Sequence, residues 1–542
     1  MRRLQVVVFG LFFTTQPAPA AGPLAQPWRD SDDVIAGWDW SLPPGTRPSP
    51  RGWIAYGHGE DLDVPFPPGN RVIPLYVRWR DLEPREGEYD FAEVRQRIER
   101  IRAAGPGVNL YLRAAVWRFD RVDRQGNVTQ PSRGQEFAES APRWLEPLGV
   151  PLMTEKAITN NASPFQITNC DIFHPAYHER YLRLIRALGA SGLPALDAVK
   201  VAYLCDKSAT NGEEGWTDSD QPTSGAGWER YRERLAAWAE AFGPKRHVLM
   251  TVSAKPQILA ECYRLGIGQR NGFVEMYLMH TTNPALGQSV DAAGYLVTDE
   301  SIPPLAGGWA WGDENEEYGR GWTARFGPYE TFPHRYRESM LRALQLRRTY
   351  LLTDRSDLDP PLLHYVALSL GRTVADSPDV WCYLRETATR QHPAGVRNFE
   401  RWLHQRDRPG ARTIATDEFR IEKQNTHAAD FTARRTDAAA GNRRIGFAVD
   451  DRFLPGGPHR VAFKVTYRDT GHAIWRLGYA ADGGAAQLRP ARIECGDSGE
   501  VRTATFFRAG VRFGARDLDF DFTLEAERGD AVIKFVRVVR LD

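Results

Sequence analysis

Two acidic clusters contain the residues of this sequence best suited to chemistry. The first includes Asp206, Glu213 and Glu214 and ends at Trp216, and the second has four carboxylates within the five residues 313–317. A pair of carboxyl groups can hydrolyse a glycosidic bond, because one protonates the leaving oxygen while the other attacks the anomeric carbon or activates water. The alternative is that both clusters are solvated surface loops or cation sites, since charge clusters often are.

Such groups need a scaffold to bring them together, and residues 30–405 have the pattern of one. Short apolar runs, which predict strands, alternate there with segments of helical spacing. Strands are predicted at 71–79, 108–117, 198–205, 247–253, 273–279, 305–311 and 349–352, and helices at 90–104, 174–188, 228–242, 258–265 and 335–347. The apolar run 295–297 is also strand-like, so this strand count can be wrong by one.

This alternation predicts an α/β fold with a parallel sheet. A closed (β/α)8 barrel and an open doubly wound sheet both fit the pattern. We favour the barrel, because the strand count approaches eight and no Gly-rich phosphate loop follows the first strand. After residue 411 the apolar residues alternate with period two, as in 461–467, which predicts an all-β sandwich, jelly-roll-like in type. The expected domains are therefore the barrel at 21–410 and an accessory or carbohydrate-binding-like sandwich at 411–542.

The N-terminus has the pattern of a secretory signal peptide. Arg2 and Arg3 precede an apolar stretch from Leu4 to Phe13, and Ala18-Pro19-Ala20 offers a cleavage site. We therefore expect residues 1–20 to be removed and the protein to be secreted or periplasmic. The five cysteines show no C-x-x-C spacing, so no metal site is expected from them. Cys170 and Cys205 are the first candidates for a disulfide, and buried thiols are the alternative.

The charge balance disfavours several classes of function. The chain of 542 residues has 70 Lys and Arg against 69 Asp and Glu, a net charge of +1, so it lacks the basic excess of nucleic-acid binders. Past the N-terminus no apolar run approaches the roughly 20 residues of a membrane-spanning helix. We expect no nucleic-acid partner, no membrane span and no obligatory cofactor.

The segment from Trp79 to Phe91 follows the pattern W-x-x-x-E-P-x-x-G-x-Y-x-F. Here the sequence resembles (β/α)8 glycoside hydrolases of the large retaining clan, such as the family 42 β-galactosidases, in which this segment follows the second strand. Residues 140–145 (SAPRWL) are similar to the P-x-W-L segment after the third strand of those enzymes. The resemblance covers only the barrel region. Pro84 and Gly87 are expected to form the turn before a helix, with Tyr89 and Phe91 anchoring it.

The resemblance implies a carbohydrate substrate, a retaining mechanism, an acid/base residue after the fourth strand and a nucleophile after the seventh. Family members place Asn directly before the acid/base, whereas Gly212 follows Asn211 here, so Glu213 and Glu214 both qualify. We favour Glu214, because Trp216 beside it could desolvate the carboxyl group and raise its pKa. The expected nucleophile is Glu314, with three rivals: Glu300, Glu316 and Glu317. Two other functions stay open, a catalytically silent carbohydrate-binding protein and a polysaccharide lyase.

Aromatic and polar residues near predicted strand ends are candidate sugar contacts. Indole rings can stack on the apolar faces of sugars, and polar side chains can bind hydroxyl groups. The candidates are Trp117, Trp216, Trp309, Trp311, Asp206, Arg113 and Tyr277. Ordinary core packing and buried salt bridges explain the same residues equally well.

Overall fold

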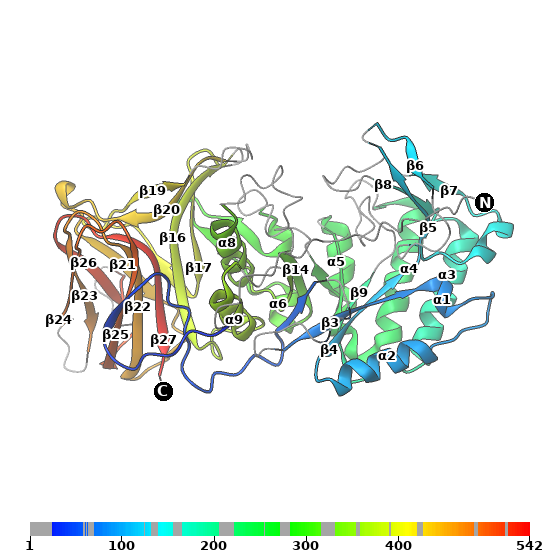
Figure 1. Ribbon diagram of the computed structural model, residues 1–542, viewed down its shortest axis with the longest axis horizontal. Helices are drawn as coiled ribbons and strands as arrows, with labels where there is room; N and C mark the ends of the chain where they lie inside the picture. Colours follow the sequence, from blue (N-terminus) through cyan, green and yellow to red (C-terminus); the bar gives the residue numbers. More distant parts are fainter. Residues whose placement is uncertain are drawn as a thin grey trace, which may run out of the picture.

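The computed structural model describes residues 24–57, 60, 62, 70–123, 125–131, 139–154, 165–204, 222–253, 255–270, 282–315, 331–353, 358–389, 392–419, 427–481, 486–514 and 519–541 (Figure 1). Residues 1–20, the expected signal peptide, lie outside these ranges. None of the helices in these ranges is long and apolar enough to cross a bilayer.

Parallel strands form the predicted barrel, eight of them in the described chain. They are β2 (Trp53–Tyr56), β3 (Val72–Arg78), β4 (Gly107–Arg113), β9 (Val199–Leu204), β10 (Leu249–Thr251), β11 (Gly268–Arg270), β14 (Trp311–Asn315) and β15 (Tyr350–Thr353). Neighbours in the sheet follow chain order, and β15 pairs with β2. A parallel bridge between Ile54 and Arg71 joins β2 to the start of β3, so the sheet nearly closes.

Helices surround this sheet and cover its outer face. They are α2 (Ala92–Ala103), α3 (Pro175–Ala190), α4 (Gly225–Phe242), α5 (Pro256–Leu265), α8 (Phe332–Gln345) and α9 (Pro360–Ser369), with a short α1 (Trp79–Leu82) before α2. On α2, the residues at helical spacing (Val94, Ile98 and Ile101) are buried against the strands. The strands are buried on both faces, as parallel strands generally are, which explains their continuous apolar runs.

One predicted strand differs from the structure, one lies outside the described residues, and one barrel strand was not predicted. The strand predicted at 305–311 is wrong, because 303–307 form the short helix α6 (Pro303–Gly307) and the barrel strand β14 starts at Trp311. The Pro303-Pro304 pair suits a first helical turn, where proline's missing N–H is not needed, and Gly308 ends the helix at φ 65°. The strand predicted at 273–279 lies outside the described residues, and β11 directly precedes it. The first strand, β2, was not predicted.

Two small antiparallel sheets interrupt the barrel pattern. After β4 the chain forms β5 (Val116–Val122), β6 (Val128–Gln130), the 3-10 helix Arg143–Leu148, β7 (Leu152–Thr154) and β8 (Phe165–Cys170), and these four strands form one sheet. The run at 295–297 corresponds to β13 (Leu296–Thr298). It pairs only with β12 (Gln288–Val290), so it is not a barrel strand.

The C-terminal region is the predicted β-sandwich. One sheet contains β1 (Asp33–Ala36), β16 (Asp379–Thr389), β17 (Val396–Arg401), β19 (Ile414–Phe419), β20 (His427–Arg435), β22 (His459–Arg468), β25 (Val501–Val511) and β27 (Val532–Arg540). The other contains β18 (Leu403–Gln405), β21 (Arg444–Val449), β23 (Ile474–Ala480), β24 (Ala486–Glu494) and β26 (Phe522–Arg528). Both sheets contribute to one apolar core, which includes Phe463 and Trp475. The expected boundary after residue 410 does not separate the sheets from the rest, because β1 and β16–β18 precede it.

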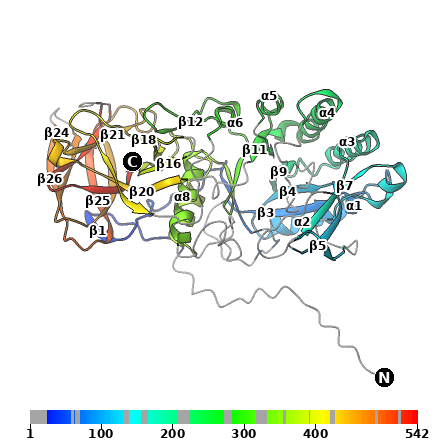
Figure 2. The same cartoon turned by 90° about the horizontal axis from the view of Figure 1, so that it is seen from above.

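Helices α8 and α9 lie between the barrel and the sandwich (Figures 1 and 2). Tyr336 of α8, Tyr365 of α9, Trp381 of β16 and Phe535 of β27 share one buried cluster. Helices α8 and α9, which follow the seventh and eighth barrel strands, therefore pack against both the barrel and the sandwich.

The four described cysteines, Cys170, Cys262, Cys382 and Cys495, are buried free thiols. Cys205 lies outside the described residues. Because Cys170 is a free thiol, the expectation that it forms a disulfide with Cys205 is wrong. Burial raises the pKa of the Cys170 thiol to about 12, as suits an inert core residue.

Candidate active site

Tyrosines fill the interior of the barrel. Tyr76 of β3, Tyr111 of β4 and Tyr203 of β9 are direct partners across three neighbouring strands, and all are buried. Tyr350 of β15 belongs to the same buried cluster, and its hydroxyl oxygen lies 3.3 Å from that of Tyr111. This layer forms the floor for the side chains nearer the carboxyl ends of the strands, where (β/α)8 enzymes carry their catalytic groups.

Glu314 lies near the carboxyl end of β14, the seventh barrel strand. Glu314 and Gly312 are two residues apart, so they lie on the same face of β14. Gly312 lies against Met250 and Tyr350 of the interior cluster, so the side chain of Glu314 also points into the barrel. The side chain is 1% exposed. It forms an ion pair with Arg270, the last residue of β11.

Two arginine–tyrosine contacts lie toward the carboxyl ends of the strands, and one of them includes Arg270, the partner of this carboxylate. The Arg270 guanidinium stands 4.6 Å from the centre of the Tyr203 ring and donates a 3.3 Å hydrogen bond to the Tyr203 hydroxyl. Arg113, the last residue of β4, lies 4.4 Å from the ring centre of Tyr76. The carboxyl end of the barrel interior thus combines one carboxylate, two guanidinium groups and two phenol rings, and Arg270 places a positive charge in contact with Glu314.

The residues on either side of Glu314 point outward and hold β14 in place. Asp313 accepts a 2.9 Å hydrogen bond from Nε of Arg348, which directly precedes β15, and both groups are fully buried. Asn315 accepts a 2.6 Å hydrogen bond from the Ser339 hydroxyl of α8. Alternation along the strand therefore separates a carboxylate that binds structural partners from the one that faces the interior.

Many of the sequence-predicted site residues lie outside the described residues. They are Asp206, Glu213, Glu214, Trp216, Tyr277, Glu316 and Glu317. Among the described candidates, Glu314 and Arg113 lie inside the barrel near its carboxyl end.

Glu300 has a structural environment away from that site. Its carboxylate accepts hydrogen bonds of 2.6 Å from Nε of Arg347 and from the indole N–H of Trp402, and it also pairs with Arg452 at 3.4 Å. Burial alone would raise the pKa of Glu300, but these partners together lower it. Arg347 precedes β15, and Trp402 and Arg452 belong to the sandwich region, so Glu300 joins the barrel to the sandwich.

The three described tryptophan candidates are in different places. Trp117 lies on β5, half-buried, with the Arg143 guanidinium 4.3 Å from its ring centre. Trp311 is 1% exposed and has no ring face open to a ligand. Trp309 lines a pocket at the amino-terminal ends of the strands, the end opposite Glu314.

Sequence reasoning did not select Arg270, Tyr203 or Tyr76. Arg270 ends a strand of only three residues, which gives almost no periodic signal. The tyrosines do leave a signal, since each sits near the carboxyl end of a strongly apolar strand. They become recognisable as one set only when the strand register aligns them.

The family-like segment from Trp79 to Phe91 is organised around a buried carboxylate. Glu83 accepts hydrogen bonds from the Trp79 indole N–H at 2.6 Å and from the Gly87 backbone N–H at 2.7 Å. Trp144 of the second motif donates to the Glu83 carbonyl oxygen at 2.8 Å. Gly87 has φ 81°, and α2 starts five residues later, so the predicted turn before a helix is confirmed. Burial raises the pKa of Glu83, although these donors oppose the shift.

Glu83→Ala is expected to lower the free energy of unfolding by about 1–3 kcal/mol, because the buried Trp79 indole N–H and the Gly87 backbone N–H lose their acceptor. Chemical denaturation at equilibrium measures it. Glu88→Ala is the matched control, since Glu88 is 61% exposed and pairs only with the exposed Arg85. Equal stability of the two variants would contradict a structural role for Glu83.

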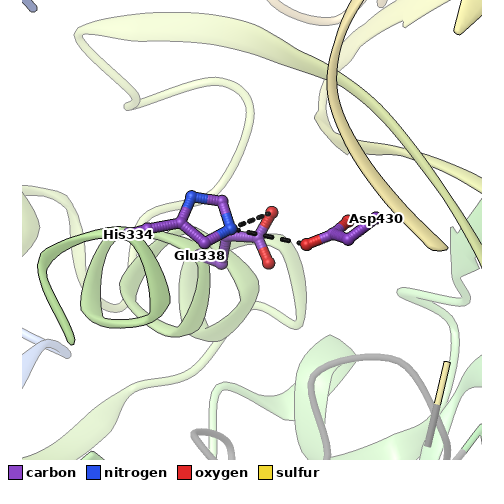
Figure 3. A group of neighbouring side chains, drawn as sticks. All are labelled: His334, Glu338 and Asp430. Atoms are coloured by element: carbon purple, nitrogen blue, oxygen red, sulfur yellow. Dashed lines mark hydrogen bonds and ion pairs between the residues drawn. The ribbon is translucent and has the colours of Figure 1, made fainter. Parts of the chain in front are cut away.

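One described group has side chains of the types that bind metal ions: His334, Glu338 and Asp430 (Figure 3). Nε2 of His334 lies 3.6 Å from Glu338 and 3.4 Å from Asp430. The buried Arg385 pairs with both carboxylates, with Nε donating to Glu338 at 3.1 Å. Burial alone would raise the pKa of Asp430, but Arg385 and His334 hold it well below its ordinary value. Arg385 supplies there the positive charge that a metal ion would bring, so the group is an ion-pair network that fastens α8 to β16 and β20.

Comparisons with known proteins give little further information. No protein-family model matches the sequence, and no curated protein matches it. Among solved structures, a match is the cold-adapted β-galactosidase from Rahnella sp. R3, at 11% identity and a TM-score of 0.24, covering 80% of this chain and 94% of that chain. A likeness this distant carries no argument, so the function below is argued from the residues and their geometry.

Proposed function

We propose that this protein is an exported glycoside hydrolase that cleaves O-glycosidic bonds of a poly- or oligosaccharide. The observation that carries the proposal is the position of Glu314, a carboxylate inside the barrel, at the carboxyl end of its seventh strand. Side chains inside a (β/α)8 barrel are normally apolar, and burying even a paired carboxylate costs desolvation, so the Glu314–Arg270 pair there favours a functional role over simple packing. The resemblance of the Trp79–Phe91 segment to retaining glycosidases also supports it, since that family has its nucleophile at this strand.

In the proposed mechanism Glu314 attacks the anomeric carbon while Glu214 protonates the leaving oxygen. The glycosyl ester is then hydrolysed as Glu214, now the base, activates water. In this mechanism Arg270, itself hydrogen-bonded to the Tyr203 hydroxyl, positions the Glu314 carboxylate through their ion pair.

A second candidate is a polysaccharide lyase, and the arginine–tyrosine contacts favour it. Cleavage by elimination requires a base and a cation that neutralises the carboxylate of a uronic acid. Arg113 with Tyr76, and Arg270 with Tyr203, combine a guanidinium and a phenol at the same end of the barrel. In this function Glu314 would keep Arg270 in place and would not react.

Product analysis separates these functions. The full chain is incubated with neutral polysaccharides and with uronate-containing polysaccharides, and reducing ends and ultraviolet absorbance are followed together. A hydrolase is expected to release reducing ends without absorbance. A lyase would produce unsaturated, absorbing ends in equal number, which would overturn the hydrolase proposal. Binding of a polysaccharide with no product of either kind would indicate the silent carbohydrate-binding protein.

A further inference from the structure

A pocket of about 220 Å³ opens at the amino-terminal end of the barrel. Its walls come from the starts of barrel strands and the turns before them. Trp53 begins β2, Lys200 is the second residue of β9, and Lys245 and Trp309 precede β10 and β14. Glu314 lies near the opposite end of its strand, so this pocket is separate from the candidate active site.

The pocket has an excess of positive charge. Arg51, Lys200 and Lys245 line it, against the single carboxylate of Asp197, so with His247 neutral the charge is three minus one, or +2. The whole chain carries only +1. The one acidic partner is weak, because the Asp197 side chain is 96% exposed although it lies 2.9 Å from Nζ of Lys200.

The two ammonium groups of the pocket are only partly compensated. Nζ of Lys245 donates to the carbonyl oxygens of Leu196 and Val199, both at 2.7 Å, which uses two of its three donors. Burial and the nearby charge of Lys200 lower the pKa of Lys245. Nζ of Lys200 lies 5.5 Å from the ring centre of Trp53. Two like charges at a half-buried site repel each other, and an anion between them would remove that cost.

We propose that this pocket binds an oxyanion, a phosphate or sulfate group. Ammonium and guanidinium groups are the usual partners of such anions, and their charge-assisted hydrogen bonds are the strong ones. Trp53 and Trp309 add aromatic surface beside the cations, of the kind that stacks on a sugar ring. The oxyanion can therefore be a free ion or a substituent of a sugar. This inference does not rest on the proposed hydrolase function.

The test is calorimetric titration of the full chain at constant ionic strength with inorganic phosphate, inorganic sulfate, glucose 6-phosphate and glucose. We expect saturable binding of one oxyanion per chain. Lys200→Gln and Lys245→Met are each expected to weaken it by about tenfold to a hundredfold, the loss of one hydrogen bond between charged groups. Lys245→Met also removes the hydrogen bonds that Lys245 donates to two carbonyl oxygens, which lowers the stability of the fold. Lys200→Gln changes a side chain that is 27% exposed and removes no such bonds, so it tests anion binding in a folded protein.

Arg102→Gln is the matched control, because it removes one positive charge from an exposed position of α2. Its affinity is expected to equal that of the unmodified protein. Tighter binding of glucose 6-phosphate than of phosphate, with none of glucose, would identify a sugar substituent. Similar affinities for phosphate and sulfate, with no gain from the sugar, would identify a free ion. The proposal is overturned if none of the three anions binds saturably, or if all variants bind equally.

Discussion

Glu314→Gln is expected to lower kcat/KM by roughly 10⁴-fold or more while the protein stays folded. Glutamine has nearly the same shape as glutamate but cannot attack the anomeric carbon, and losing the nucleophile of a covalent mechanism removes most of the rate enhancement. Initial rates on the substrate identified by product analysis measure this effect. Glu88→Gln, at a carboxylate that is 61% exposed and pairs with the exposed Arg85, is the control and should keep full activity.

The covalent role of Glu314 has a sharper test. With Glu314→Ala, a small external nucleophile such as azide can enter the space of the missing side chain and attack the anomeric carbon. Turnover should then return, with a glycosyl azide of inverted anomeric configuration as the product. Full activity of Glu314→Gln, or no effect of azide on an otherwise folded Glu314→Ala protein, would contradict the assignment of Glu314 as the nucleophile.

Arg385→Met is expected to lower the free energy of unfolding by about 3–5 kcal/mol, the usual cost of leaving buried charges without their partner. Arg385 is fully buried and pairs with Glu338 of α8 and Asp430 of β20. Its removal leaves two buried carboxylates whose described partners are then His334 and the Tyr383 and Thr387 hydroxyl groups. Equilibrium denaturation measures the loss. Arg102→Met is the control, because exposed ion pairs contribute little.

The pH dependence of this variant should be opposite to that of the unmodified protein. Asp430 has a pKa below its ordinary value in the folded state. Its contribution to stability is therefore complete above the pKa of the unfolded chain and is lost as pH falls through the folded pKa. In Arg385→Met, protonation of the unpaired carboxylates relieves the buried charge. The stability difference between the two proteins should therefore shrink on going from about pH 7 to about pH 4. A difference that grows toward acid pH would contradict this account.

Several parts of the fold could be predicted from local sequence. Long amphipathic segments such as α3 and α4 have their apolar residues at helical spacing, and large apolar residues alternate along the sandwich strands β22 and β23. The Trp79–Phe91 motif predicted its own turn, because Gly87 and the Glu83 carboxylate act within a few residues of one another. Strands of three or four residues are too short to show a period, and they were predicted unevenly. β10 and β15 were predicted, whereas β2 and β11 were not, and Pro303-Pro304 begins a helix within a run that was predicted as a strand.

The sequence by itself determined which residue types are available and the architecture that holds them: a parallel barrel, a sandwich and carboxylates near strand ends. The tertiary structure alone decided which carboxylate faces inward. Asp313 and Glu314 are neighbours in the chain, yet one is bound to Arg348 outside the sheet and the other meets Arg270 inside it. The reason is physical, since side chains alternate across a strand, but the face that becomes the interior depends on closure of the sheet by strands far apart in sequence. Arg270 and Tyr203 join Glu314 only through that closure.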